Sequence, residues 1–171
     1  MNFKIREIKV EEHKRLGEMM VRSYENLDGF PSQKSAPQYY QTLENIGDLT
    51  SHTDIKIFVC ISDTDVLTGG VVYINDVNSY GQTKFPDSCS NAGAFRLLVV
   101  DDKFRRKGIG KLLTNYCIQY AIKQGRNQVV IHTTKSMNNA WRMYEKMGFK
   151  RFPKIDFYMN TLLVYGLKLK L

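Results

Sequence analysis

A short segment with two glycines and four cations follows an apolar strand and opens a helix. The residues are Arg105, Arg106, Lys107, Gly108, Ile109, Gly110 and Lys111, and an apolar run at 95–100 precedes them. Glycine allows a sharp turn and a close approach of the backbone to a ligand. The first N–H groups of the following helix lack partners inside the helix, and the helix dipole adds partial positive charge there. The segment therefore predicts an anion site suited to a pyrophosphate.

Two other glycine-rich phosphate motifs do not match this segment. A dinucleotide-binding fingerprint needs a third glycine three positions after the second, where this chain has Leu113. A P-loop needs four residues between its glycines and a Ser or Thr after the lysine, but Leu112 follows Lys111. The pattern that remains is Arg-x-x-Gly-x-Gly after a Val-rich strand.

A second motif lies one strand further along, at residues 137–149. It reads Met-Asn-Asn-Ala-Trp-Arg-Met-Tyr-Glu-Lys-Met-Gly-Phe. The first pattern resembles the acyl-CoA signature of the GCN5-related N-acetyltransferase (GNAT) superfamily, and the second resembles the Asn-x-x-Ala-x-x-x-Tyr-Glu-x-x-Gly-Phe helix of that family. Met137 stands where many members carry asparagine, and Asn138 or Asn139 could substitute for it. On these two motifs the chain is identified as a member of the superfamily.

The resemblance implies a fold and a cofactor. The fold is mixed α/β, with a central, mostly antiparallel twisted sheet, helices on both faces and one parallel βαβ unit whose strands splay. The cofactor is acetyl-CoA, with its pyrophosphate on the glycine loop and its pantetheine arm between the strands at 95–100 and 128–133. The residues implied as cofactor-binding are Leu98, Val99, Val100, Arg105, Arg106, Lys107, Gly108, Ile109, Gly110, Lys111 and Asn139.

Tyr144 is the catalytic residue that the resemblance implies. A phenol with a pKa near ~10 is protonated at neutral pH and can give a proton to a leaving thiolate of pKa near ~8.5. Without the motif, Tyr144 would be interpreted as a core residue of an amphipathic helix. The general base stays open. The candidates are Glu25, Asp28, Asp76, Asp156, His13, His52 and His132, although a lone strand histidine such as His132 is more often structural.

The length and composition of the chain limit the number of domains and the classes of protein that it can belong to. A chain of 171 residues predicts a single domain, 1–171, and 43% hydrophobic residues are ordinary for a globular protein. No apolar run approaches the ~18 residues that span a bilayer, so no membrane association and a cytoplasmic location are expected. Three cysteines of irregular spacing are expected to be reduced, and no His or Cys pair has zinc-ligand spacing, so no metal is predicted.

The net charge of +8 attracts anions. Five of the cations lie at or near the glycine loop, where a phosphorylated cofactor would use them, so no nucleic acid is expected as a partner. We expect direct transfer of acetyl to the primary amine of a small molecule or peptide in a ternary complex, since neither cofactor motif contains a cysteine. The alternative is a non-catalytic acyl-CoA-binding regulatory or sensor module. A homodimer is left open.

Periodicity predicts the elements around the motifs. Alternating or continuous apolar runs predict strands at 3–6, 55–62, 66–75, 95–100, 128–133 and 162–171. Helical spacing predicts helices at 11–26, 37–49, from the glycine loop to Gly125, and around Tyr144 up to Gly148. The segments 26–36 and 76–93 are expected to be loops that determine acceptor specificity.

Overall fold

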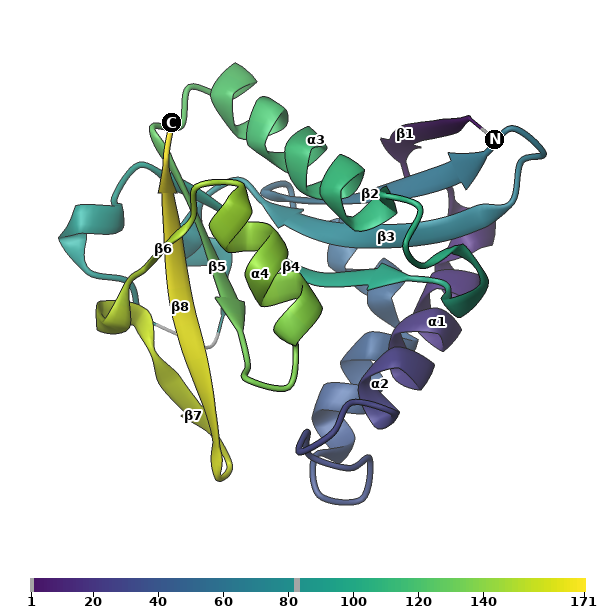
Figure 1. Ribbon diagram of the computed structural model, residues 1–171, viewed down its shortest axis with the longest axis horizontal. Helices are drawn as coiled ribbons and strands as arrows, with labels where there is room; N and C mark the ends of the chain where they lie inside the picture. The colour runs from purple at the N-terminus through teal and green to yellow at the C-terminus, as the bar shows by residue number, and fades with distance from the viewer. Residues whose placement is uncertain (1, 82–83) are drawn as a thin grey trace.

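A twisted sheet forms the centre of the molecule. The computed structural model describes residues 2–81 and 84–171. Within these residues eight strands form one sheet in the order β1-β2-β3-β4-β5-β8-β6, with β7 paired to β8 (Figure 1). All neighbouring pairs are antiparallel except β4 and β5. The strands are β1 (Phe3–Glu7), β2 (Ile55–Ser62), β3 (Leu67–Ile74), β4 (Ala92–Val100), β5 (Gln128–Thr133), β6 (Lys150–Arg151), β7 (Phe157–Met159) and β8 (Leu162–Lys170).

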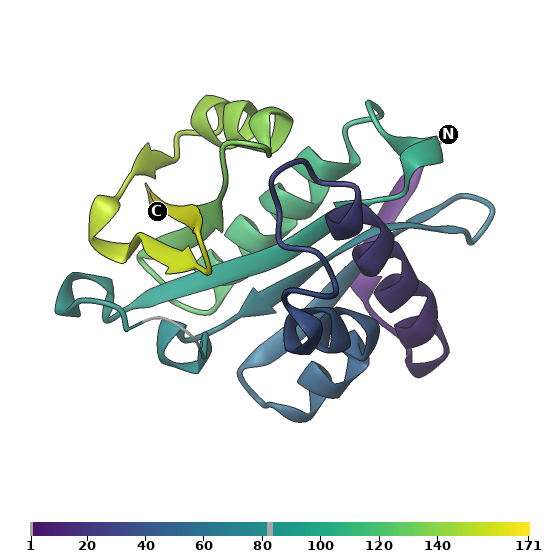
Figure 2. The same cartoon turned by 90° about the horizontal axis from the view of Figure 1, so that it is seen from below.

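Helices cover both faces of this sheet. They are α1 (His13–Glu25), α2 (Pro37–Glu44), α3 (Ile109–Lys123) and α4 (Asn138–Lys146). Figure 2 shows α1 and α2 on one side of the sheet and α3 and α4 on the other. The two faces of β2 contribute to two hydrophobic cores. Ile57 and Val59 pack in the first core, between the sheet and α1 and α2, and Phe58 and Cys60 pack in the second core, between the sheet and α3 and α4. A strand buried on both faces is apolar on both, which explains the continuous apolar run at 57–61. The mixed fold expected from the sequence is confirmed.

The parallel strands β4 and β5 separate soon after they begin. They pair at Ala92 with Gln128, at Gly93 with Val129 and at Ala94 with Val130, and the pairing ends there. From Phe95 onward β4 continues to pair with β3 alone. The side of β4 that faces β5 therefore carries unpaired main-chain groups along its second half, which is the splayed unit that the resemblance implied.

A bulge accompanies this separation. Between the pairs Val72–Arg96 and Gly70–Val99, β4 contains one residue more than β3, and Leu97 has a φ of 56°. A leucine in the left-handed region costs roughly 1–2 kcal/mol, which the surrounding packing must offset. Gly69 permits the close approach of the two strands at this point, because a Cβ there would lie 2.6 Å from the Val99 carbonyl oxygen.

Two predicted segments differ from the structure. The helix expected at 37–49 ends at Glu44, and a 3-10 helix follows at Ile46–Ser51. The reason lies at Asn45, whose side-chain amide donates to the Gln41 carbonyl at 3.0 Å and whose backbone leaves the helical region. The loop expected at 76–93 contains 3-10 turns at Val77–Ser79 and Asp87–Cys89, and β4 already begins at Ala92. Residues 82–83 of that loop lie outside the described residues.

Tyr73 offers a test of the second core. Its hydroxyl is buried without a hydrogen-bond partner among the described residues, beside the ring of Tyr120. Because the hydroxyl is desolvated without compensation, Tyr73→Phe should raise the free energy of unfolding by about 1 kcal/mol in urea denaturation. Tyr40→Phe is the matched control: the Tyr40 hydroxyl donates to the Pro31 carbonyl at 2.9 Å, and its loss should lower stability by a similar amount. A destabilised Tyr73→Phe would contradict this account.

Candidate functional site

A cavity of about 1130 Å³ lies where β4 and β5 separate. Most of its lining comes from α1 and the loop after it, β4, the glycine loop, the end of β5 and the start of α4, and further residues come from α2, the loop before β4, β7 and β8. This volume is slightly above the ~300–1,000 Å³ of small-molecule sites, so it can hold a large ligand and a second molecule beside it. The opening of the sheet therefore creates the site.

The glycine loop forms one end of the cavity. Arg105, Arg106, Gly108 and Lys111 line it, and α3 begins at Ile109 directly after Gly108. Gly108 has a φ of 80°, a conformation that side-chain-bearing residues rarely adopt. This turn presents the first N–H groups of a fifteen-residue helix to the cavity, together with the loop cations. The arrangement can bind an anionic group such as a pyrophosphate.

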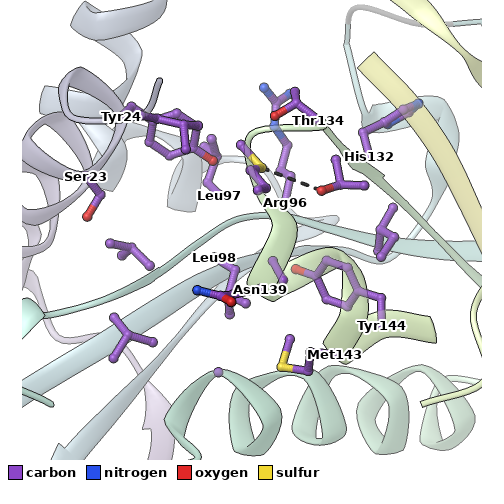
Figure 3. Close-up of a pocket in the computed structure, with 18 of the residues that line it drawn as sticks. Ser23, Tyr24, Arg96, Leu97, Leu98, His132, Thr134, Asn139, Met143 and Tyr144 are labelled. Atoms are coloured by element: carbon purple, nitrogen blue, oxygen red, sulfur yellow. Dashed lines mark hydrogen bonds between the residues drawn. The ribbon is translucent and has the colours of Figure 1, made fainter. Parts of the chain in front are cut away.

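Tyr144 lies on the wall formed by α4. Its ring packs against Phe95, at 5.9 Å between centroids, and Phe149, at 5.7 Å, and only 5% of its surface is exposed. The hydroxyl points toward the part of the cavity where Leu98 and Asn139 lie (Figure 3). Burial raises the pKa of this phenol well above its ordinary value, because apolar surroundings disfavour the phenolate. Tyr144 is therefore a neutral O–H donor across the physiological range of pH.

His132 also lines the cavity, but both of its ring nitrogens are occupied. Nε2 lies 2.8 Å from the Ile155 carbonyl oxygen and must donate to it, so Nδ1, at 2.8 Å from the Tyr80 hydroxyl, accepts from that hydroxyl. Burial lowers the pKa of His132 to about 4. The histidine is neutral and fixes Tyr80, which agrees with the structural role that its isolation in the sequence suggested.

None of the carboxylates proposed from the sequence as a general base lines the cavity. The described lining residues include no Asp or Glu at all. Asp156 is engaged elsewhere, where it accepts hydrogen bonds from Arg151 and from the Gly166 N–H. Among the described residues no cluster of His, Cys, Asp or Glu could hold a metal ion, and none of the helices is long and apolar enough to cross a membrane.

Comparison with known proteins decides the family. The protein-family model described as "Acetyltransferase (GNAT) family" matches residues 17–149. This range is most of the chain and includes the whole glycine loop and α4. The chain belongs to the GNAT acetyltransferase family.

The curated relatives of this GNAT chain are longer proteins. N-alpha-acetyltransferase 30 of Xenopus laevis is 36% identical over 80 residues, which are 46% of this chain and 29% of that protein. N-acetylaspartate synthetase of Danio rerio is 35% identical over 68 residues, which are 40% of this chain and 24% of that protein. The matches thus span less than a third of the length of these relatives.

Solved structures share the whole GNAT fold. PaiA N-acetyltransferase of Thermoplasma acidophilum, solved in complex with coenzyme A, superposes with a TM-score of 0.74 at 18% identity over 100% of both chains. A GNAT family acetyltransferase of Staphylococcus aureus Mu50 superposes with a TM-score of 0.72 at 19% identity over 99% of both chains. At such identities the likeness concerns the fold.

The cavity brings together nearly all the site residues predicted for this GNAT chain. Tyr144, Asn139 and every predicted cofactor-binding residue of β4 and the loop line it, except Lys107. The Lys107 ammonium instead lies 5.0 Å from the centroid of the Phe104 ring, beside the cavity. The role of each residue stays a prediction, but their convergence in one space is observed.

Sequence reasoning missed the opposite side of the cavity. Tyr24, Tyr80 and Arg96 line it, and none of the three was proposed as a site residue. Helical spacing places Tyr24 on the apolar stripe of the helix predicted at 11–26, and it does pack in the first core. No local motif marks Arg96; the only signal is a charged residue inside an otherwise apolar strand. The two predicted specificity loops do reach the cavity, through Leu27 and Phe30 and through Tyr80.

The pKa of His132 makes stability depend on pH. Below its ordinary pKa of 6.5 the unfolded chain binds a proton at this histidine that the folded chain, with a pKa of about 4, does not bind. Stability should therefore fall as the pH drops from about 6.5 to about 4, by up to about 3 kcal/mol from this residue. In thermal melts His132→Gln should show a flatter acid dependence, whereas His52→Gln, at an exposed position, should keep the original slope. Equal slopes for the wild type and His132→Gln would refute the assignment.

Proposed function

We propose that this chain is an acetyl-CoA-dependent N-acetyltransferase that acts as one domain, 1–171, and transfers acetyl directly to a primary amine in a ternary complex. The observation that carries the proposal is a convergence. One cavity holds a cationic glycine loop at a helix start, the unpaired edge of β4 and the hydroxyl-bearing Tyr144. The acceptor belongs to a small molecule or a peptide.

The residues on the cavity wall fit acetyl-CoA. Arg105, Arg106, Lys111 and the N–H groups that follow Gly108 suit its pyrophosphate. Main-chain groups of Leu98, Val99 and Val100 on the open side of β4 suit the amides of its pantetheine arm, because a strand edge offers both donors and acceptors. When bound, the cofactor supplies acetyl as a thioester and carries away a thiol. Asn139, in the first turn of α4, lies where it can contact the same arm.

The chain's own residues assist the transfer in two ways. A C–N bond forms as the C–S bond breaks, the ammonium loses a proton and the departing sulfur gains one. Tyr144 offers its O–H to that sulfur, and a β4 N–H stabilises the negative charge that develops on the carbonyl oxygen. With no carboxylate on the described wall, the amine's proton leaves through water rather than to a side chain.

The relatives support this choice of chemistry. N-alpha-acetyltransferase 30 and N-acetylaspartate synthetase bear names that describe acetyl groups on nitrogen. Two solved neighbours, PaiA N-acetyltransferase and YncA of Salmonella typhimurium, were crystallised with coenzyme A and acetyl-CoA. These names favour an N-acetyltransferase over the non-catalytic sensor module.

The first test concerns the glycine loop. Arg105→Ala combined with Gly108→Asp removes a cation and places a carboxylate at the helix start, so affinity for acetyl-CoA should fall at least about tenfold in calorimetry. The matched control is Lys123→Ala with Gly125→Asp, at the other end of α3. Gly125 also has a positive φ, of 72°, so the control reproduces the backbone strain without touching the cavity. Equal losses of affinity in both variants would mean that the loop does not bind the cofactor.

The second test concerns Tyr144. Tyr144→Phe keeps the ring packing and removes the proton, so turnover should fall about 10²–10⁴-fold, or ~3–5 kcal/mol of barrier, while affinity for acetyl-CoA is retained. Tyr73→Phe makes the same chemical change at a buried tyrosine outside the cavity and should keep full turnover. Normal turnover in Tyr144→Phe would remove Tyr144 from the mechanism. A wild type that binds acetyl-CoA but acetylates no amine would support the sensor module.

A further inference from the structure

The cavity has two halves that belong to different cores. The cofactor half comprises the glycine loop, Asn139, Met143 and Tyr144, on the side of α3 and α4. The acceptor half lies on the side of α1 and α2, and Figure 3 shows Tyr24, Arg96 and His132 there, away from Met143 and Tyr144. Its wall is mainly apolar or aromatic: Tyr24, Leu27, Phe30, Tyr80, Phe157 and Met159. A molecule that binds in this half must therefore present an apolar surface to most of it.

Arg96 is the charged residue of the acceptor half. Its guanidinium lies 5.0 Å from the centroid of the Tyr80 ring and donates one long hydrogen bond, of 3.4 Å, to the Tyr80 carbonyl. Tyr80 is itself fixed by its 2.8 Å hydrogen bond to His132. Among the described residues no carboxylate lies within ion-pair distance of Arg96, unlike Arg6, Arg15, Arg105 and Arg151. Most of its five N–H donors are left for a ligand.

The charge of Arg96 is felt across the acceptor half. Burial raises the pKa of Tyr24 to about 12, and the positive charge of Arg96 acts in the opposite direction. The same opposition holds at Tyr80, where burial again raises the pKa and Arg96 lowers it. A half-buried guanidinium, held in place by an aromatic ring and facing no carboxylate, is a site for an anionic group, and a planar fork of donors suits a carboxylate best.

The cavity wall also constrains the amine. Since no described lining residue is acidic, nothing there attracts a polycation or accepts a proton from an ammonium. The α-amine of a free amino acid, with a pKa near ~9.5, has a neutral fraction at pH 7 about tenfold larger than that of a lysine side chain near ~10.4. The site therefore favours an α-amine over a lysine or polyamine nitrogen.

We propose that the acceptor is a free α-amino acid with an apolar or aromatic side chain, whose carboxylate binds the Arg96 guanidinium and whose α-amine faces the Tyr144 side of the cavity. This inference rests on the proposed acetyl transfer and names its acceptor. A peptide N-terminus has the same amine, but an amide replaces the carboxylate next to it, so Arg96 would have no anion to bind.

The experiment compares leucine, methionine and phenylalanine with their amides, with phenylalanyl peptides blocked at the carboxyl end, and with aspartate and spermidine. Thiol release from acetyl-CoA is the readout. The free amino acids should exceed their amides at least tenfold in kcat/KM, even though an amide's amine is the more readily deprotonated of the two. Amides or blocked peptides that match the amino acids, or a preference for aspartate or spermidine, would overturn the proposal.

Variants of Arg96 test whether its guanidinium causes the preference for a free carboxylate. Arg96→Met should lower kcat/KM for phenylalanine about 10- to 100-fold, leave phenylalaninamide unchanged and keep the affinity for acetyl-CoA. Arg96→Lys, which keeps the charge but not the fork, should recover part of the loss. Arg142→Met is the matched control, because Arg142 is exposed on α4 and does not line the cavity. An unchanged preference in Arg96→Met would refute the role of Arg96.

A binding measurement separates this inference from the proposed function. Phenylalanine is titrated by calorimetry into wild type and Arg96→Met, each saturated with CoA, so that no turnover occurs. Binding to the wild type that is lost in Arg96→Met supports the carboxylate site even if no amine in the set is acetylated, in which case the proposed transfer alone fails. Transfer to amines without any binding of phenylalanine overturns the inference and leaves the proposed function in place.

Discussion

The end of β4–β5 pairing at Ala94 governs the whole site. Three residue pairs join these strands, and beyond them β5 continues beside β8 while β4 continues beside β3. Had the ladder continued, its hydrogen bonds would have filled the space that the cavity occupies. The bulge at Leu97 turns the backbone of β4 at the same place, and its local strain is compatible with a stable fold because β3 packs closely against it through Gly69. Burial on both faces of the central strands stabilises a sheet that is interrupted at its middle.

The charged side chains that line the described part of the cavity are all positive. Fixed cations line it at the glycine loop and at Arg96, whereas the buried titratable groups in its wall are neutral. Burial keeps the Tyr144 phenol protonated and His132 unprotonated, since in apolar surroundings each charged form is disfavoured. The site is thus built to bind anionic ligands and to supply hydrogen-bond donors, and none of its described lining residues is a carboxylate that could act as a base. In the proposed transfer, the acceptor amine would therefore lose its proton to water and not to a side chain.

Local motifs in the sequence mark the cofactor half of the cavity, whereas hardly any sequence feature marks the acceptor half. Gly108 and the cations near it are contiguous and their backbone requirement is specific, so the loop could be predicted before the fold was known. Tyr144 could be predicted only through its motif, because helical spacing alone makes it a core residue, and it is indeed 5% exposed. Arg96 gave only the weak signal of a charge inside an apolar strand, because its role depends on Tyr80 and His132, which are distant from it in the sequence. The end of α2 at Glu44 was missed for a different, local reason: one asparagine side chain competes with the helix, and periodicity does not detect that competition.

Side chains of β4 and β5 line both halves of the cavity. Arg96 and Leu98 belong to the same strand, one lining the acceptor half and the other the cofactor half, and His132 lies next to the end of the neighbouring strand. Arg96 belongs to β4, and the Tyr144 ring packs against Phe95 of the same strand, so the sheet relates the two groups in space. The proposed α-amino acid carries its anionic group and its amine on a single carbon, so both would lie at the place where the two halves meet. Its side chain would then face the aromatic wall formed by Tyr24 and Tyr80.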